Sequence, residues 1–319
     1  MAGLHLNSNF LSVVIPAFNE EHVIGETVKK IVGILDLSSI DYEIVVVNDG
    51  SMDQTLAVLR KIKPKYGIRI IDFCENVGHM CAIRAGLEAS IGNYVATIDA
   101  DLQDPPEYLP EMFSKLLKSK DSILNRYDVV QAFRQDRTQD TRFKRISADL
   151  YYKLVRKLTG ISVIPHAADF RIMNRAVVDK LLLLPEKKLV LRLVIPSLGF
   201  KILPFPIVRA ARFAGKTKYT ISKMFSLAID SIISFTYKPL RILALFGFLT
   251  SGFLLCGAIA ALCLSYFGST VPGWTSLILL ILSTNALLIA ILGLLGEYVG
   301  RIYELAQARP RPVWTEIEN

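Results

Sequence analysis

The longest uncharged stretch of this 319-residue chain runs from Ile242 to Gly296, where 55 consecutive residues include no Asp, Glu, Lys or Arg. A helix that crosses the hydrocarbon core of a bilayer needs about 20 apolar residues. The stretch therefore predicts two membrane-spanning helices, near 242–267 and 274–296, joined by a turn at 268–273. The hydrophobic share of the whole chain, 52% of residues, agrees with this prediction.

The charges that flank this stretch predict its orientation. Lys238 and Arg241 precede the first predicted span, Arg301, Arg309 and Arg311 follow the second, and the predicted outer loop has no Lys or Arg. Because cytoplasmic flanks carry the excess of Lys and Arg, we predict a multi-pass protein of the inner (cytoplasmic) membrane with both termini in the cytoplasm. The N-terminus lacks the pattern of a signal peptide, and the Pro-rich tail within 301–319 is expected to be extended.

Before the first predicted span, short apolar runs alternate with helical patterns. Continuous Val and Ile runs are typical of buried parallel strands. We therefore predict an α/β fold, a Rossmann-like domain over 1–218 with a mostly parallel sheet, whose ligands bind at the carboxyl ends of the strands. The predicted strands are 11–16, 42–49, 68–73, 93–101 and 128–133, and the predicted helices are 20–35, 55–62 and 79–89.

Polar side chains follow the first four of these strands. Since the carboxyl ends of parallel strands meet at one edge of the sheet, we expect the side chains to form one site. Asp53 and Asn19-Glu20-Glu21 also stand where helices begin, so helix capping is an alternative role for them. His79 is a candidate for contact with a phosphate or for a cap. The candidates at this edge are Pro16, Asn19, Glu20, Asp49, Asp53, Asn76 and Asp99.

Asp99 and Asp101 are two carboxylates just past a predicted buried strand, and Gln103 supplies a further oxygen at the same spacing. Mg²⁺ is usually held by one or two carboxylates together with substrate phosphates. The pattern predicts a site for Mg²⁺ or Mn²⁺ that would stabilise a diphosphate leaving group. A solvated acidic loop is the alternative interpretation.

The formal charge of +8 indicates an anionic partner. Basic residues gather next to two amphipathic patterns, a basic interfacial helix at about 142–160 and a juxtamembrane helix at 219–241, so anionic lipid is favoured. We predict no nucleic acid partner, because aromatic stacking platforms are not evident. A solvated basic face is the alternative for the first helix. Arg171 is a candidate for contact with a phosphate and Asp169 for positioning or deprotonating the group that reacts, and a structural salt bridge between the two is the alternative. The candidate ligands for an acceptor phosphate are Arg134, Lys144, Arg145, Arg171, Arg212 and Lys218.

Taken together, these motifs resemble the inverting glycosyltransferases of family 2, which have the nucleotide-sugar-binding GT-A fold. The second half resembles polyprenyl-phosphate glycosyltransferases, above all the bactoprenol glucosyl transferases, near the dolichyl-phosphate mannose synthases and the aminoarabinose-transferring enzymes. Asn48 departs from the pattern, since many relatives have an Asp there. The motifs are VVIPAFNEE at 13–21, VVVNDGSMD at 45–53, NVGH at 76–79, DADLQDPP at 99–106, AADFRIMNR at 167–175, RFAGKTKYTISKM at 212–224 and GLLGEYVGRIYE at 293–304.

The resemblance implies roles for particular residues. It assigns Asp99, Asp101 and Gln103 to the metal and the diphosphate. It places Pro16, Asn19, Glu20, Asp49 and Asp53 around the nucleotide, and it gives the acceptor phosphate to Arg134, Lys144 and Arg145.

These expectations combine into one predicted reaction, the inverting transfer of a single sugar from a nucleotide-sugar to a polyprenyl phosphate. UDP, glucose and undecaprenyl phosphate are favoured, with GDP-mannose and an aminoarabinose donor as alternatives. Asp101 and Asp169 are the predicted catalytic residues, although a phosphate monoester is already largely ionised near neutral pH (second pKa about 6) and needs little activation. A processive polysaccharide synthase is disfavoured because no QxxRW motif is present. A non-catalytic membrane scaffold that only binds nucleotide or anionic lipid is the alternative in which the protein is not an enzyme. Glycines 293, 296 and 300 are spaced for close helix contact and allow a homo-oligomer.

Overall fold

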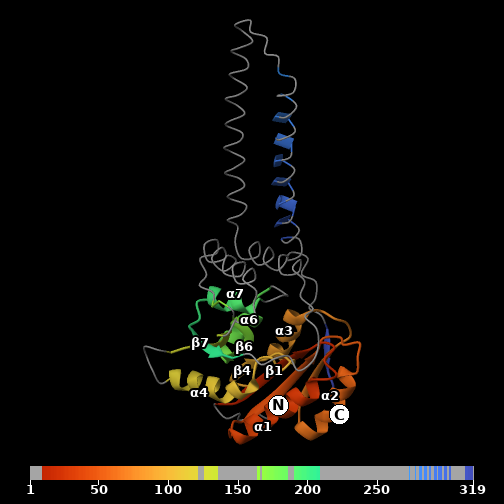
Figure 1. Cartoon of the computed structure of the whole chain (residues 1–319), viewed down its shortest axis with the longest axis vertical. Helices are drawn as coiled ribbons and strands as arrows, with labels where there is room; N and C mark the ends of the chain where they lie inside the picture. The colour runs from red at the N-terminus through yellow and green to blue at the C-terminus, as the bar shows by residue number, and fades with distance from the viewer. Residues whose placement is uncertain are drawn as a thin grey trace. The chain divides into compact units, whose positions relative to one another are not determined.

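The computed structural model describes residues 9–120, 126–135, 164–165, 167–185, 190–208 and 313–318, together with scattered positions between 273 and 302. The chain divides into two compact units. One unit comprises Met1–Arg156, Ile161–Tyr219 and Pro310–Asn319, and the other comprises Lys157–Gly160 and Thr220–Arg309. The first unit carries the predicted site, and the labelled elements belong to it (Figure 1).

The first unit is built on one eight-stranded sheet with the order β7-β5-β6-β4-β1-β2-β3-β8. Strands β4, β1, β2 and β3 run parallel to one another, while β6 is antiparallel to both β4 and β5. This arrangement confirms the predicted α/β class and its mostly parallel sheet. The strands are β1 (Leu11–Ala17), β2 (Tyr42–Asn48), β3 (Arg69–Phe73), β4 (Tyr94–Thr97), β5 (Val129–Arg134), β6 (Ala167–Asn174), β7 (Ile202–Ile207) and β8 (Trp314–Glu316).

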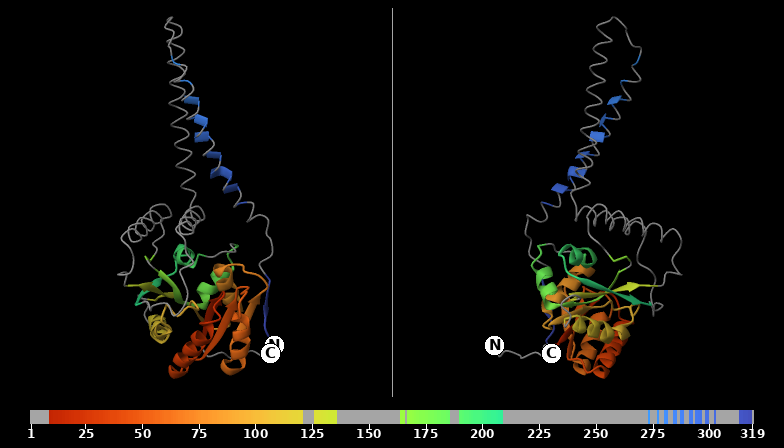
Figure 2. Two further views of the ribbon diagram at one scale, coloured as in Figure 1. Left: turned by 45° about the vertical axis from the view of Figure 1, so that its right-hand side comes forward. Right: turned by 90° about the vertical axis from the view of Figure 1, so that its left-hand side faces the viewer.

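Helices cover both faces of the sheet. On one face lie α1 (Ile24–Leu37), α2 (Thr55–Tyr66), the short helix η1 (Pro106–Tyr108) and α4 (Leu109–Lys120). On the other face lie α3 (His79–Ala89) and α6 (Arg175–Leu182), with α7 (Leu191–Ser197) packed against α6. The two groups appear below and above the strands in Figure 1, and the turned views show the same layers (Figure 2).

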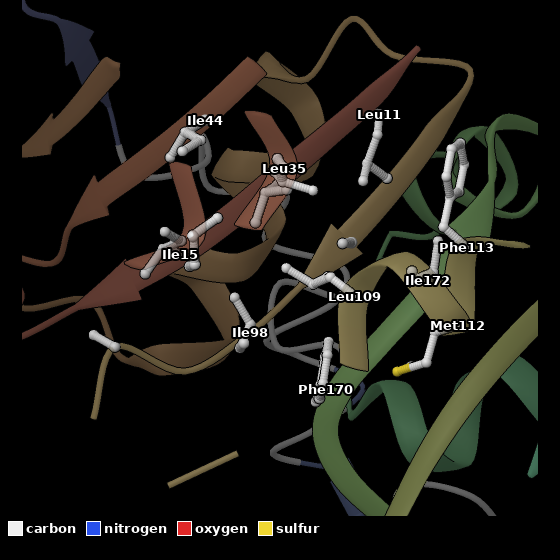
Figure 3. Packing of buried hydrophobic residues seen from close by; sticks show 14 of the residues in the cluster. Leu11, Ile15, Leu35, Ile44, Ile98, Leu109, Met112, Phe113, Phe170 and Ile172 are labelled. Atoms are coloured by element: carbon white, nitrogen blue, oxygen red, sulfur yellow. The ribbon is translucent and has the colours of Figure 1, made fainter. Parts of the chain in front are cut away.

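The hydrophobic core explains why α1 packs where it does. The residues Ile24, Val28, Ile31 and Leu35 of α1 are fully buried, and their spacing places them on one side of a helix. They belong to the same buried cluster as the alternate β1 residues Leu11, Val13 and Ile15 (Figure 3). The opposite face of β1 meets α3 at Gly86, where a Cβ atom would lie 2.2 Å from Val14 Cγ1.

Three predicted boundaries are wrong by four residues. Helix α2 ends at Tyr66 instead of residue 62, and the other two errors fall at the predicted site. Helix α1 begins at Ile24 instead of residue 20, and the backbone N–H groups of Glu20 and Glu21, in the loop before it, donate to Thr55 Oγ1 and Asp53 Oδ2. Strand β4 ends at Thr97 instead of residue 101, because its pairing with β1 stops at Val14. Both segments become loops at the carboxyl edge of the sheet.

The C-terminal tail returns to the sheet and adds β8 antiparallel to β3, so the expected extended tail is confirmed at these residues. Arg69 of β3 donates from Nε and Nη2 to the two carboxylate oxygens of Glu316, at 2.7 and 2.9 Å. The same guanidinium donates to Glu43 Oε2 at 2.8 Å. Such a two-pronged contact is the strong form of an ion pair, and it holds the tail against the edge strand.

Replacing Glu316 with glutamine is expected to lower the free energy of unfolding by about 0.5–1 kcal/mol, the range for a partly exposed ion pair. Hydrogen bonding to Arg69 lowers the pKa of Glu316 below its ordinary value of 4.5. The contribution is therefore present at neutral pH and is lost as the pH falls through the lowered pKa. Urea titrations at pH 7 and pH 3.5 measure it, with Glu318→Gln as the matched control, and equal stabilities of the two variants at pH 7 would contradict the prediction.

The predicted membrane segments lie largely outside the described residues. This holds for the interfacial helix at about 142–160, the juxtamembrane helix at 219–241, the first span at 242–267 and most of the tail from 301 to 312. Within the second predicted span, 274–296, the described positions are helical. In the part of the chain that is described, no helix is long and apolar enough to cross a membrane.

Candidate active site

The predicted site lies beside β1, where the order of the strands in the sheet reverses: β2 and β3 lie on one side of β1 and β4 lies on the other. Strand β1 sits between β2 and β4, and α1 and α3 cover opposite faces of the sheet. Open α/β sheets bind ligands at the carboxyl ends of the strands beside such a switch point. Pro16 is buried near the end of β1, two residues beyond the last pair between β1 and β4. It has no N–H group that a continued ladder would need.

The loops after β1 and β2 are joined by hydrogen bonds between candidate residues. Asn19, at φ +54°, donates from its N–H to Ser51 Oγ at 3.0 Å and accepts from the N–H of Met52 at 2.9 Å. Asp53 accepts from the N–H of Thr55 at 2.9 Å and from the N–H of Glu21 at 3.2 Å. Asp53 thus accepts from the first N–H group of α2, although the N-cap position of that helix is Gln54. Nucleotide contacts for Asn19, Glu20 and Asp53 remain predictions.

Asp49 organises the loop that follows β3. The residue is 3% exposed, and its carboxylate accepts hydrogen bonds from the N–H groups of Val77 (2.8 Å) and Gly78 (3.1 Å) and from Asn76 Nδ2 (3.2 Å). Burial raises the pKa of the Asp49 carboxyl, and the Val77 and Gly78 N–H groups offset only part of that effect. These contacts connect the loops after β2 and β3. The neighbouring Asn48 donates to Asp72 Oδ1 at 2.7 Å, so this departure from the family pattern makes a polar contact within the sheet.

Gly50 is required by the close approach of these two loops. Its φ is +62°, and a Cβ atom there would lie 2.2 Å from the backbone carbon of Glu75. Gly67 has the same φ with open space around it. Gly67→Ala is expected to cost about 1 kcal/mol for the left-handed backbone, and Gly50→Ala about 2 kcal/mol more because backbone atoms must move. Urea unfolding of the two variants measures the difference, and similar costs would contradict the described loop packing.

The loop after β4 presents the predicted metal ligands. Thr27 of α1 donates from Oγ1 to the Ala100 carbonyl at 2.7 Å, which fixes the Asp99-Ala-Asp101 segment against the helix. The chain then turns sharply: Leu102 has a φ of +56°, and Asp101 Oδ1 accepts from the Gln103 N–H at 3.1 Å. Asp99 keeps 27% of its side chain exposed.

This loop fits a divalent cation. Gln103 is 5% exposed, and its Oε1 is buried without a hydrogen-bond partner in the described part of the chain. An orphaned buried acceptor beside two carboxylates suits a hard cation, which prefers oxygen ligands. Among the described residues, no group of three or more His, Cys, Asp or Glu could hold a metal alone.

A second polar cluster lies beside the metal loop. Asp169 and Arg171 are alternate residues of β6, and Arg171 Nη2 donates to Asp169 Oδ1 at 2.7 Å. Arg192, in the first turn of α7, donates to Asp169 Oδ2 at 3.1 Å. His79, at the start of α3, places Nε2 3.7 Å from Asp99 Oδ1 and 4.0 Å from Asp169 Oδ2. One imidazole thus connects the predicted metal loop with the predicted acceptor residues.

The charges of this cluster shift the pKa values of its members. Burial would raise the pKa of Asp169, but Arg192 and Arg171 outweigh it and hold this pKa well below the ordinary range. Burial lowers the pKa of His79 despite the nearby Asp169 carboxylate, so the imidazole is largely neutral at pH 7. Burial also lowers the pKa of Arg171, and Asp169 opposes that shift. Asp169 is therefore ionised throughout the physiological pH range and is a weak base.

The backbone around Asp169 is held from two sides. Gln131 of β5 is 3% exposed and donates from Nε2 to the carbonyls of Ala168 (2.7 Å) and Phe170 (3.1 Å). Thr97 Oγ1 donates to the Asp169 carbonyl at 3.0 Å. The pairing of β5 with β6 is irregular between Gln131 and Phe133, which matches this local arrangement. These three hydrogen bonds hold the backbone on both sides of Asp169 and so limit how far its carboxylate can move.

The predicted acceptor ligands are only partly described. Arg134 ends β5, where it is half-buried and its Nε lacks a hydrogen-bond partner among the described residues. Lys144, Arg145, Arg212 and Lys218 lie outside those residues. Arg171 is fully buried. Sequence reasoning missed Arg192 and Gln131, and it left the role of His79 open. The one signal for Arg192 is a lone charge within the apolar run LVLRLVIP.

The switch-point sheet, the acidic loop after β4 and the adjacent arginine cluster together define a glycosyltransferase of the GT-A type. The chain belongs to glycosyl transferase family 2, whose pattern matches residues 12–182. This membership confirms the predicted enzyme class, a hexosyltransferase.

Relatives extend the match over nearly the whole chain. An uncharacterized glycosyltransferase of Bacillus subtilis, YkcC, is 40% identical over 94% of this chain and 91% of its own length. The bactoprenol glucosyl transferase of Shigella phage SfV is 35% identical over 94% of this chain and 96% of its own length. These identities confirm the predicted resemblance to polyprenyl-phosphate glycosyltransferases.

A solved structure supports the fold alone. Glucosyl-3-phosphoglycerate synthase from Mycobacterium tuberculosis, crystallised with Mn²⁺, UDP and phosphoglyceric acid, superposes with a TM-score of 0.51 at 21% identity. The match covers 70% of this chain and 76% of that protein.

Proposed function

We propose that this enzyme transfers a single sugar from a nucleotide-sugar to a polyprenyl phosphate, with inversion at the anomeric carbon, at the cytoplasmic face of the membrane. The observation that carries the proposal is the position of His79, with its Nε2 between Asp99 of the metal loop and Asp169 of the arginine cluster. A carboxylate-rich donor site and a guanidinium-rich acceptor site thus meet at one side chain, as a transfer between two phosphate-bearing substrates requires.

On the donor side, Asp99, Asp101 and Gln103 would hold Mg²⁺ or Mn²⁺. A divalent cation there would stabilise the negative charge that develops on the departing nucleoside diphosphate. The loops after β1, β2 and β3 surround the nucleotide, and their shared hydrogen bonds keep them in place before the donor binds. The structural neighbour named above was crystallised with Mn²⁺ and UDP, and these are the ligands to test first.

On the acceptor side, the phosphate oxygen of the lipid attacks the anomeric carbon. A new bond forms between that oxygen and the carbon, while the bond from the carbon to the nucleoside diphosphate breaks and its electrons leave with the diphosphate. Because the phosphate is already largely ionised near neutral pH, no strong base is needed. The weak basicity of Asp169 is therefore compatible with the reaction.

The membrane location rests on the second unit and on the tail. Apolar side chains are exposed along the described helical positions from 277 to 302, and large exposed apolar surfaces mark sites of interaction with a membrane or a partner. These side chains are Leu277, Leu280, Ile281, Leu288, Leu292, Leu295, Val299 and Ile302. The chain leaves the first unit after β7 and returns to it at β8, so any crossings between them are even in number. Two spans with the enzyme domain and both termini in the cytoplasm meet that condition.

UDP-glucose and undecaprenyl phosphate are the favoured substrates. The named activity of the phage relative, bactoprenol glucosyl transfer, supports glucose and a bacterial polyprenyl acceptor. GDP-mannose with a dolichyl or other polyprenyl phosphate is the alternative. Transfer from each of the two donors to the lipid phosphate decides between these alternatives.

Nucleotide binding by the purified full chain tests the donor side. UDP is expected to raise the melting temperature in the presence of Mn²⁺ and to raise it much less after chelation, because the cation would join the diphosphate to Asp99 and Asp101. GDP serves as the comparison for base preference. A nucleotide effect that is identical with and without the cation would contradict the metal site, and no effect of either nucleotide would favour the scaffold alternative.

A further inference from the structure

We propose that the C-terminal strand β8 keeps the active site directed toward the lipid acceptor, and that Glu316, through Arg69, holds this strand in place. The proposal rests on the proposed function and deepens it, because it gives a role to a tail that the sequence motifs do not cover. Strand β8 then attaches the first unit to the returning chain, and Glu316 is a positioning residue for the reaction.

The chain leaves and rejoins the first unit at opposite ends of the sheet. The strand order places β7 at one end and β8 at the other, seven strand spacings apart. At about 4.8 Å for each spacing, the two strands are separated by roughly 30 Å. The segment 220–309, which belongs to the second unit, lies between β7 and β8 in the sequence. Release of β8 would therefore free one whole end of the sheet from the returning chain.

Both strands also meet the rest of the chain at the edge of the sheet that carries the site. Strand β7 is parallel to β5 and runs in the same direction as β1, so it ends at the carboxyl edge with Ile207. Strand β8 is antiparallel to β3, so it begins at that edge, where Trp314 pairs with Phe73. The site beside β1 thus lies between the two strands through which the chain departs and returns.

Side-chain contacts supplement the short ladder between β8 and β3. The Ile317 N–H donates to the Ile70 carbonyl at 2.9 Å, and the Ile317 side chain packs half-buried against the hydrophobic core. Lys63 of α2 donates from Nζ to the Ile317 carbonyl. The Arg69 guanidinium donates to both carboxylate oxygens of Glu316. Because β8 has only three residues, these contacts supply much of what holds it to the sheet.

Arg69 is oriented by residues other than those of the tail. Its Nη1 donates to Glu43 Oε2 and to the Ala89 carbonyl, both at 2.8 Å. Glu43 Oε1 in turn accepts from the Ile91 N–H at 2.7 Å. The guanidinium therefore presents Nε and Nη2 to Glu316 in a fixed direction, and a preoriented fork loses little conformational freedom when it binds a carboxylate.

This attachment matters for one substrate more than for the other. The phosphate of a polyprenyl lipid stays at the membrane surface, whereas a nucleotide-sugar reaches the site from solution. If the lipid binds only enzyme that is correctly directed, its apparent KM equals the intrinsic value divided by the directed fraction, and kcat at saturation is unchanged. A rise in the lipid KM alone, with unchanged UDP affinity, is the signature that distinguishes this role from a loss of structure.

A linker insertion separates the attachment from the strand itself. About 20 Gly and Ser residues are inserted between Arg309 and Pro310 of the full-length enzyme, in nanodiscs that contain undecaprenyl phosphate. Hydrogen exchange of the Ile317 N–H, kcat and UDP affinity should not change. The lipid KM should rise about fivefold, because the insertion about triples the stretch 303–312 and effective concentration falls roughly as the −3/2 power of linker length. The same insertion after Ser39, in the exposed loop between α1 and β2, is the control and should change none of these quantities.

Glu316→Lys tests the contact that holds the strand. It sets a second positive charge against Arg69, so the Ile317 N–H should exchange faster and the lipid KM should rise as it does with the insertion, while UDP affinity stays within about twofold. Glu318→Lys makes the same change of charge at an exposed position two residues further on and should leave all three quantities unchanged.

Two results would overturn the proposal. An unchanged lipid KM in the insertion variant would leave β8 with a structural role only. Weaker UDP binding by Glu316→Lys, with an unchanged lipid KM, would place the tail at the donor site instead. If Glu316→Lys fails to fold, the insertion variant decides by the same KM. Failure of the proposed function is a different result, since the wild-type enzyme would then bind UDP and form no product with undecaprenyl phosphate.

Discussion

Asp101→Asn is expected to leave the protein folded and to lower sugar transfer by roughly 10²–10³-fold, the loss seen when one preorganised charge stabiliser is removed. The described contact of Asp101 is its acceptance of the Gln103 N–H at 3.1 Å, and an amide oxygen can accept that bond equally well. What the variant loses is the negative charge that a divalent cation needs. The turn at Leu102 should therefore persist while the metal site fails.

Initial rates with a labelled nucleotide-sugar, together with the melting temperature, measure the two halves of this prediction. Asp36→Asn is the matched control, because Asp36 is an exposed carboxylate that accepts from the Tyr42 hydroxyl, at the far end of α1 from the site. It should transfer sugar at the normal rate. Near-normal turnover by Asp101→Asn would exclude the metal role of this loop.

Asp169→Ala is expected to produce the largest loss of stability, about 3–5 kcal/mol, because it leaves the fully buried Arg171 without its counter-charge. Burial already lowers the pKa of Arg171, and Asp169 is the main group that opposes this effect. Asp169 itself has a lowered pKa, so its contribution is present above the ordinary Asp pKa of about 3.9 and is lost only as the pH falls below it. The loss should therefore be the same at pH 6 and pH 8.

A double-mutant cycle separates the ion pair from simple loss of packing. Arg171→Met removes the buried charge, and the double variant Asp169→Ala with Arg171→Met should recover most of the stability. Urea unfolding of the four proteins gives the coupling free energy. If the double variant is as unstable as Asp169→Ala alone, the buried guanidinium is not the cause.

The sequence patterns predicted the parallel part of the sheet well, for a simple physical reason. Strands buried on both faces need continuous apolar runs, such as Val13-Val14-Ile15 and Val45-Val46-Val47, and few other structures do. The apolar runs also show about where each strand ends. Because the carboxyl ends of parallel strands lie at one edge of the sheet, Asn19, Asp49 and Asp99 could be predicted to lie together there. Boundaries were less well predicted, because the length of β4 depends on where β1 stops pairing.

Other features depended on contacts between distant segments. Arg192 meets Asp169 across 23 positions, and its neighbours in the chain are apolar residues that resemble core. Strand β8 has only three residues, and its place in the sheet depends on Arg69, 247 positions away from Glu316. For Asp53, the residue type was right but capping and ligand binding share the same short polar side chains. Local spacing cannot separate the two roles, whereas the hydrogen bond from the Thr55 N–H shows that Asp53 contacts the start of α2.

The product formed by the purified full-length enzyme tests the central proposal most directly. The enzyme is incubated in lipid nanodiscs with undecaprenyl phosphate, Mg²⁺ or Mn²⁺, and a panel of labelled nucleotide-sugars, and the organic extract is analysed by mass spectrometry. We predict one hexose for each lipid phosphate, formed from UDP-glucose with inversion, so that an α-linked donor gives a β-linked product. A sugar polymer, or the absence of any lipid-linked sugar with every donor in the panel, would contradict it.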